Sequence, residues 1–242
     1  AESSPTPEIR SLVINDGAIT YRDAAAQAEL DLSIATGAAV AGGEFGGLRV
    51  EGRGVALGQP VQLDFEIGSP LLLATRAAPL PITGKLESGS SLLTVDGKVR
   101  DALAMDGLDL DLALDSADPA PLLALAGRRV AQGRLPPLRA HARLTADGSV
   151  FAASGLAIDW GETHATGELS YAAAQPRPRF EGRLHAPLID VVALRPVVEA
   201  EALSPPGSTE TRLTPGPLAT HDGSVELTIE RIRLPATEIS DV

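Results

Sequence analysis

The clearest indication of the fold is LDLDLALD, residues Leu108 to Asp115. Leucine occupies every second position, and the positions between are Asp109, Asp111, Ala113 and Asp115. An alternation with a period of two is typical of a β-strand, because successive side chains of a strand point to opposite faces of the sheet. The stretch therefore predicts a strand with one aliphatic face and one solvated face.

The same alternation recurs in short runs along the chain, so we predict a mainly β fold. Asn15–Gly17, Asp96–Gly97 and Asp147–Gly148 predict hairpin turns, because such residues tolerate a positive φ, and Ser88–Ser91 also reads as a turn. The run Val225–Leu234 changes phase, which predicts a bulge near Glu230 or Arg231. The other clear runs are Leu48 and Val50; Leu63, Phe65 and Ile67; Leu138, Ala140, Ala142 and Leu144; and Phe180, Gly182, Leu184 and Ala186.

Two segments predict short helices. The first runs over 119–130, where Asp118 can act as the N-cap and Pro119 suits the first helical position. The second, over 189–194, would end before Pro196. Residues 202–223 are rich in Pro, Ser, Thr and Gly and predict a loop or linker.

So few helices cannot cover the aliphatic faces of so many strands. Burying one Leu or Ile stabilises a fold by roughly 1.5–3 kcal/mol, so these faces need a covering. The sheet must either close on itself as a sandwich or curl into a trough whose aliphatic interior receives a partner. The residues alone leave both alternatives open.

Composition excludes several classes of function. The chain has 20 Lys and Arg against 32 Asp and Glu, a formal net charge of −12, which argues against a nucleic-acid partner. No stretch of about 18 apolar residues predicts a membrane span. The sequence has no Cys, hence no disulfide framework, and lacks an initiator Met and a signal-peptide pattern. We therefore expect a soluble segment of a longer protein.

No motif predicts catalysis, a metal site or a cofactor. Gly52, Gly54 and Gly58 match a dinucleotide loop only loosely and read better as strand or turn glycines. Trp160 is expected at a sheet edge or core boundary. The four histidines lack metal-ligand spacing, and the acidic set reads as a solvated strand face rather than a calcium site: His141, His164, His185 and His221; Asp101, Asp106, Asp109, Asp111, Asp115 and Asp118.

Taken in order, these segments resemble the AsmA family of bacterial envelope proteins. Residues 9–23, IRSLVINDGAITYRD, look like the family's early hairpin, and 97–127 resemble its Leu-and-Asp strand followed by a Leu-rich helix. Residues 135–187 are similar to the family's best-kept block, and 223–242 look like the first strand of a further repeat. The usual N-terminal transmembrane helix has no counterpart, and His164 stands where a small polar residue is common.

The resemblance implies an elongated, curled antiparallel sheet that forms a groove, a β-taco-like fold with one or two short helices. It also implies a periplasmic protein, anchored in the inner membrane by a part outside this chain, and related to bridge-like lipid transfer proteins. Expected partners are phospholipid or another acyl-chain lipid and envelope assembly proteins. A groove segment would then span 1–201, a linker 202–223, and 224–242 would begin the next repeat or return to the same sheet.

We accordingly expect a lipid-binding or lipid-conducting groove rather than an enzyme, with no catalytic residue, metal or cofactor. The alternative is a closed β scaffold, or a protein-binding module of the envelope, without lipid. The candidate lipid-binding residues are Leu48, Val50, Leu63, Phe65, Ile67, Leu108, Leu110, Leu112 and Leu114. These residues could equally pack as ordinary core beneath the helix at 119–130.

Overall fold

The computed structural model describes most of the chain as strands of one sheet. The described residues are 13–24, 28–37, 47–56, 58–69, 78–101, 104, 106–125, 135–173, 177–193, 222–234 and 238–240. The strands are β1 (Gly17–Asp23), β2 (Ala28–Thr36), β3 (Leu48–Ala56), β4 (Gln59–Ile67), β5 (Leu80–Ser88), β6 (Ser91–Val99), β7 (Leu108–Ser116), β8 (Leu138–Asp147), β9 (Val150–Trp160), β10 (Thr163–Ala172), β11 (Arg179–Asp190), β12 (Asp222–Ile229), β13 (Arg231–Arg233) and β14 (Glu238–Ser240), and the helix is α2 (Ala120–Leu125). Among these residues no helix is both long and apolar enough to cross a membrane.

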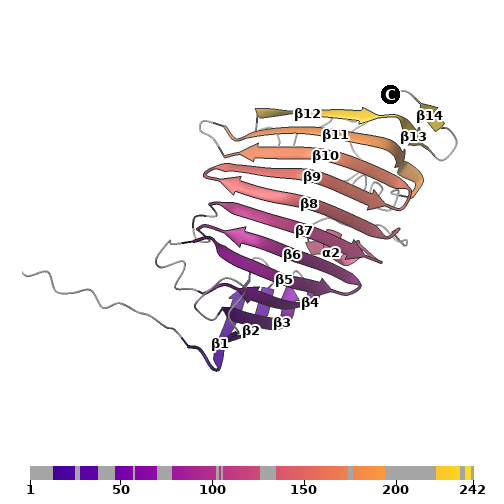
Figure 1. Ribbon diagram of the computed structural model, residues 1–242. Helices are drawn as coiled ribbons and strands as arrows, with labels where there is room; N and C mark the ends of the chain where they lie inside the picture. The colour runs from indigo at the N-terminus through magenta and orange to yellow at the C-terminus, as the bar shows by residue number, and fades with distance from the viewer. Residues whose placement is uncertain are drawn as a thin grey trace, which may run out of the picture.

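All fourteen strands belong to a single open sheet, which confirms the expected mainly β fold. Each strand from β1 to β10 pairs antiparallel with the next, so the sheet grows one strand at a time along the chain as far as β11 (Figure 1). β12 and β13 instead pair in parallel with β11, so the last part of the sheet departs from the expected antiparallel arrangement. Parallel neighbours need a longer connection than a hairpin turn, and 31 residues separate the end of β11 from the start of β12.

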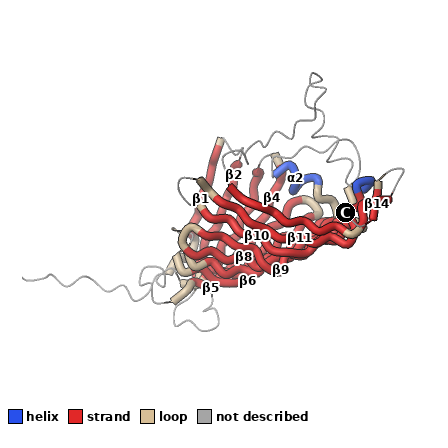
Figure 2. Tube along the Cα trace, turned by 90° about the horizontal axis from the view of Figure 1, so that it is seen from above, coloured by secondary structure: helices blue, strands red, loops and turns tan. Residues whose placement is uncertain are grey.

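The sheet is curled rather than flat. In Figure 1 the strands β5 to β12 form one tall ladder, and β1 to β4 turn away from its plane. Figure 2 shows α2 on the side toward which these first strands turn. The helix contacts β4, so it lies on the inner side of the curl. The structure therefore favours the curled trough over the closed sandwich.

Two of the four predicted turns lie where the sequence places them. The β8–β9 hairpin turns between Asp147 and Val150, and the β5–β6 hairpin turns at Gly89, within the serine-rich cluster. At Asn15–Gly17 the chain enters β1, which begins at Gly17, and the residues before 13 lie outside the described part of the chain. The turn predicted at Asp96–Gly97 is wrong, because both residues lie inside β6. A Cβ on Gly97 would overlap the carbonyl oxygen of Asp109, so glycine is needed there for the close approach of β7.

The first predicted helix is present and begins as expected. The amide of Ala120 donates a hydrogen bond of 3.1 Å to Oδ1 of Asp118, which is the N-cap bond. Pro119 lies buried just before α2, which ends at Leu125. The remainder of the expected helix, up to residue 130, lies outside the described residues.

The second predicted helix begins later than expected. Ile189 and Asp190 are the last residues of β11, and helical residues follow at 191–193, while 194 lies outside the described residues. Asp190 ends the strand because its Oδ1 accepts hydrogen bonds from the amides of Val192 and Ala193, at 3.0 and 3.2 Å. Its own amide donates to Oγ1 of Thr163 at 2.9 Å, which ties this corner to β10.

The chain is irregular at Glu230, as expected, and the neighbouring strand β11 is irregular at the same level of the sheet. β12 ends at Ile229 and β13 begins at Arg231, yet both keep the same offset to β11. β11 itself shifts register against β10 between residues 185 and 188, so the two neighbours change phase together. The division of the chain at 202–223 is outside the described residues, apart from Asp222 and Gly223, which begin β12 in the same sheet.

Glycines on the inner face allow large side chains to lie flat on neighbouring strands. Gly84 on β5 is paired with Phe65 on β4. A Cβ built on Gly84 would overlap the Phe65 ring and would lie 2.7 Å from the carbonyl oxygen of Asp64. The aromatic ring therefore covers the glycine, and the inner face stays smooth at this point.

Replacing Gly84 by Ala tests this packing. Gly→Ala in a strand is usually mildly stabilising, but here the new methyl must displace Phe65 and crowd the backbone, which costs about 1–3 kcal/mol. We expect a lower urea midpoint for Gly84→Ala, measured by circular dichroism. Gly37→Ala is the control, since its nearest neighbouring atom would be 3.8 Å away, and it should unfold like the parent. Equal midpoints for all three proteins would contradict the proposed contact.

Candidate functional site: an aliphatic trough

The two faces of the sheet differ sharply in chemistry. On β7 the leucines face the inner side of the curl, and Asp109, Asp111 and Asp115 face the outer side. Directly paired residues on neighbouring strands project from the same face, so the strand register extends this division across the sheet. We call the aliphatic side the inner face and the charged side the outer face.

The inner face carries three rows of apolar residues that run across the strands from β3 to β10. Every residue in these rows is Gly, Ala, Val, Leu, Ile or Phe, and we call them together the floor. The first row is Gly52, Leu63, Leu86, Leu93, Leu114, Ala140, Ile158 and Ala165; the second is Val50, Phe65, Gly84, Val95, Leu112, Ala142, Leu156 and Gly167; the third is Leu48, Ile67, Ile82, Gly97, Leu110, Leu144, Ala153 and Leu169.

Buried rows flank the floor on both sides in the middle of the sheet. On one side, Ser88, Ser91 and Ser116 are buried near α2, and the hydroxyls of Ser91 and Ser116 are hydrogen-bonded at 2.7 Å. On the other side lies a buried cluster, which we call the distal margin, formed by Leu80, Val99, Leu108 and Ala146 with exposed fractions of 3, 1, 7 and 3%. The floor residues of β5, β6 and β7 between these rows are only half-buried. On β5, β6 and β7 the half-buried apolar residues of the floor thus form a trough between two buried edges.

Eight of the nine predicted liners lie in the floor. Val50, Phe65 and Leu112 share its second row, and the rest are Leu63 and Leu114 in the first row and Leu48, Ile67 and Leu110 in the third. Leu108 is placed differently, because it is buried in the distal margin beside Leu80 and Val99. The predicted liners on β3, β4 and β7 therefore share one surface, and β5 and β6 connect its two parts.

Several floor residues were missed by the sequence reasoning. β6 contributes Leu93 and Val95, whose alternation was interrupted by the reading of Asp96–Gly97 as a turn. β9 contributes Leu156 and Ile158, in even phase, after Ala153 in odd phase. The phase changes at Gly155, which has a φ of 58° and forms an extra residue against both neighbouring strands. The available sequence signal for this bulge was a glycine between an odd-numbered and an even-numbered run of apolar residues.

Ion pairs between neighbouring strands cover the outer face. Arg143 on β8 donates two hydrogen bonds to Asp109 on β7, at 2.7 and 2.9 Å. These bonds hold the pKa of the Asp109 carboxyl below its usual value, and partial burial acts in the opposite direction. Arg139 and Asp115 pair in the same way at 3.1 Å. The expected reading of the acidic residues as a solvated face is correct for Asp109, Asp111 and Asp115.

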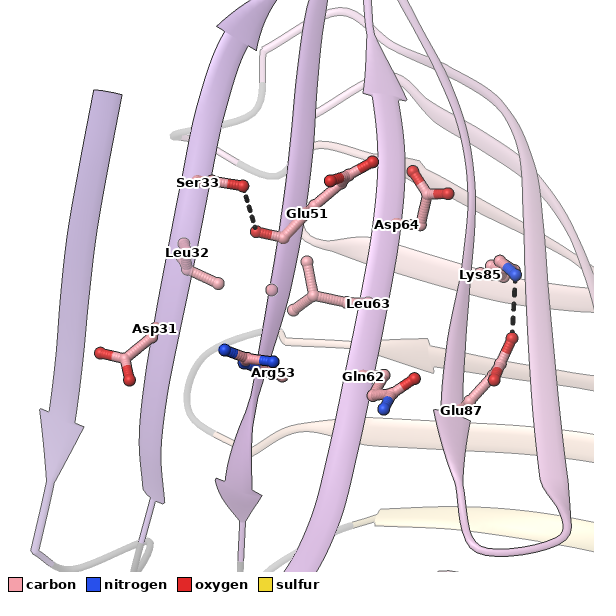
Figure 3. A pocket seen from close by; sticks show the side chains of 11 residues that line it. Asp31, Leu32, Ser33, Glu51, Arg53, Gln62, Leu63, Asp64, Lys85 and Glu87 are labelled. Atoms are coloured by element: carbon pink, nitrogen blue, oxygen red, sulfur yellow. Dashed lines mark hydrogen bonds and ion pairs between the residues drawn. The ribbon is translucent and has the colours of Figure 1, made fainter. Parts of the chain in front are cut away.

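The outer face also has a hollow of about 590 Å³ across β2 to β5, shown in Figure 3. It lies between two polar rows: Asp31, Arg53, Gln62 and Glu87; and Ser33, Glu51, Asp64 and Lys85. Lys85 pairs with Glu87 at 2.9 Å, and the Ser33 hydroxyl donates to the carbonyl oxygen of Glu51 at 3.4 Å. The lining is thus mainly polar and charged, and the hollow offers no aliphatic surface comparable to the trough.

The histidines are scattered, as the sequence predicts. His141, His164 and His185 are exposed on the outer face, and His221 lies outside the described residues. His164 contacts Asp159 at 2.6 Å, and His185 contacts Glu230 at 3.1 Å. Within the described part of the chain, no group of three or more His, Cys, Asp or Glu is placed to hold a metal ion.

The pair between Arg143 and Asp109 predicts a pH-dependent contribution to stability. Because the folded-state pKa of Asp109 is lowered, this contribution is present above the usual Asp pKa and is lost as the pH falls through the lowered value. In Arg143→Gln we expect the Asp109 pKa to rise in an NMR titration. Its urea midpoint should fall below that of the parent at neutral pH and converge with it below about pH 4. Arg53→Gln, on β3, is the control, and an unchanged Asp109 pKa in Arg143→Gln would refute the assignment.

Comparison with known proteins supports the family resemblance. Over 161 residues, 64% of its length, the chain is 29% identical to the AsmA family protein YhjG of Escherichia coli strain K12, and it spans only 23% of that protein's length. No family model and no solved structure matches the chain. The sequence relationship, together with one long curled sheet whose inner face is aliphatic, supports the resemblance of the chain to AsmA family proteins.

Proposed function

We propose that the trough binds the acyl chains of phospholipid or a similar lipid and lets them lie across the strands. The observation that carries this proposal is the floor, three uninterrupted apolar rows that are half-buried between two buried edges. Monomeric soluble proteins rarely leave a large contiguous apolar surface uncovered, and such a surface marks a ligand or partner site. An acyl chain is apolar, flexible and narrow enough to follow it.

The dimensions of the floor support an acyl chain as the occupant. At the usual spacing of ~4.8 Å between strands, the eight strands from β3 to β10 span about 35 Å. One leaflet of a bilayer, half of a hydrocarbon core of about 30 Å, is shorter than this. A chain lying across the strands therefore meets similar aliphatic contacts at successive positions, and no single position holds it more tightly than the next.

The energetics require no charged headgroup site. Each buried acyl methylene contributes roughly 0.8 kcal/mol, so a chain lying in the trough can be held by hydrocarbon contacts alone. The acidic and basic side chains lie on the outer face, where Arg143 and Arg139 are engaged by Asp109 and Asp115. The headgroup would remain in water above the trough, which makes binding insensitive to headgroup chemistry.

We further propose that this activity belongs to the bacterial envelope. The AsmA family resemblance supports a periplasmic setting, inner-membrane anchoring in the full-length protein, and a role in outer-membrane assembly or lipid homeostasis with envelope assembly proteins as further partners. Since the chain spans only 23% of its relative, these are properties of a longer protein to which the trough contributes one section.

Native mass spectrometry after incubation with phosphatidylethanolamine vesicles tests lipid binding. We expect bound phospholipid on the parent chain and its loss in Leu112→Asp, because a carboxylate in the second floor row is costly to desolvate beside an acyl chain. Ala113→Asp is the matched control, since it adds the same charge to the next residue of β7 on the exposed outer face. It should bind lipid like the parent, and circular dichroism checks that both variants fold.

Two outcomes would contradict the proposal. A folded parent chain that takes up no lipid would point instead to a scaffold or protein-binding module of the envelope. Equal lipid binding by the parent and a folded Leu112→Asp would place the lipid somewhere other than on the floor.

A further inference from the structure

The distal margin of the trough changes character between β8 and β9. From β5 to β8 it is the buried cluster of Leu80, Val99, Leu108 and Ala146. The same cross-strand row continues from Ala146 to Phe151 on β9, Tyr171 on β10 and Phe180 on β11. Phe151 and Phe180 are half-buried and Tyr171 is 36% exposed, so the margin is open at these strands.

A hollow of about 320 Å³ lies at this opening. It is lined on the inner face by the three aromatic residues and by Leu144, Ala153 and Leu169, which belong to the third row of the floor. We call this group the aromatic opening. Leu169 is 38% exposed, and the rings of Phe151 and Tyr171 are tilted by 40° with centroids 6.5 Å apart. The hollow is therefore continuous with the floor through shared residues.

The chemistry of the aromatic opening differs from that of the rest of the trough. The sequence contains 4 Phe, 2 Tyr and 1 Trp, and three of these seven aromatic residues meet here. Rigid rings with a polar hydroxyl at one end suit a boundary where one side is apolar and the other is wet. Among the described lining residues Glu181 alone is charged, and it lies on the outer face and pairs with Arg179. The volume of the hollow lies at the small end of the range for ligand sites, which suits a hydrocarbon segment rather than a headgroup.

We propose that the aromatic opening is the place where an acyl chain enters the trough from the side, before it moves along the floor toward β7. This inference rests on the proposed function, because a side entrance has meaning only if the floor holds acyl chains. A chain inserted past Tyr171 would first contact Leu169 and Ala153 and then reach Leu144 and Leu110 along the third row. The buried margin over β5 to β8 offers no equivalent access.

Site-directed fluorophores test the order of contact. The chain has no Cys, so single Cys variants can be labelled without a background. Tyr171→Cys reports the opening and Val95→Cys the middle of the floor, while Glu168→Cys on β10 and Thr94→Cys on β6 report the outer face. The probe is a phosphatidylcholine vesicle carrying a nitroxide on its acyl chain. We expect the label at 171 to be quenched before the label at 95, and the outer labels to be unaffected.

The possible results separate the two proposals. Quenching at 95 without quenching at 171, or before it, would overturn the side entrance and leave acyl binding by the floor intact. Quenching at neither inner position would overturn both proposals. Quenching at 171 alone would limit lipid contact to the opening, which contradicts a path along the floor.

A second variant measures whether the opening controls uptake. Ala153→Phe places a ring in the hollow, and we expect it to slow lipid uptake several-fold while the final amount bound stays equal to that of the parent. Ala157→Phe, on an outward position of β9 that pairs with His141 and lies outside the hollow, is the control and should load at the parental rate. A folded Ala153→Phe with parental uptake kinetics would overturn the proposal.

Discussion

The two faces of the sheet stay chemically distinct because the register of hydrogen bonds between neighbouring strands is kept from strand to strand. A strand that slipped by one residue would turn its leucines outward and its aspartates inward, because side chains alternate with a period of two. The register holds from Leu48 on β3 to Leu169 on β10, so eight strands contribute to the same three apolar rows. The floor is a consequence of this continuous pairing and belongs to no single strand.

Two irregularities preserve the floor where the sequence changes phase. At Gly155, β9 has one extra residue relative to both neighbouring strands. Because of this extra residue, Leu156 and Ile158 face the inner side together with Ala153, although they differ from it in odd and even numbering. Near Ala186, β11 makes a similar shift, and its parallel neighbours follow it because their offset is unchanged at Glu230. The bulges therefore serve the same end as the regular strands: they keep aliphatic side chains on the inner face.

The sequence predicted the strands, the serine-rich turn and the Asp118 cap because these depend on contacts between near neighbours in the chain. It misplaced a turn at Gly97, because a glycine that permits a close approach by β7 has the same local signature as a turn glycine. It also started a helix too early at Ile189, because Asp190 was not recognised as the cap that ends β11. The missed floor residues in β6 and β9 follow from the same limit, since their phase depends on partners in other strands.

Alternation and composition are local properties, and they are enough to show that the protein is built of amphipathic strands with an aliphatic and an acidic face. The three-dimensional structure was needed to show that these faces form an open trough instead of a closed sandwich, because closure depends on how the whole sheet curls. It also decided that Leu108 is buried in the margin while Leu110, Leu112 and Leu114 line the floor. All four leucines share one pattern in the chain, and only their distance from the ends of β7 separates their roles.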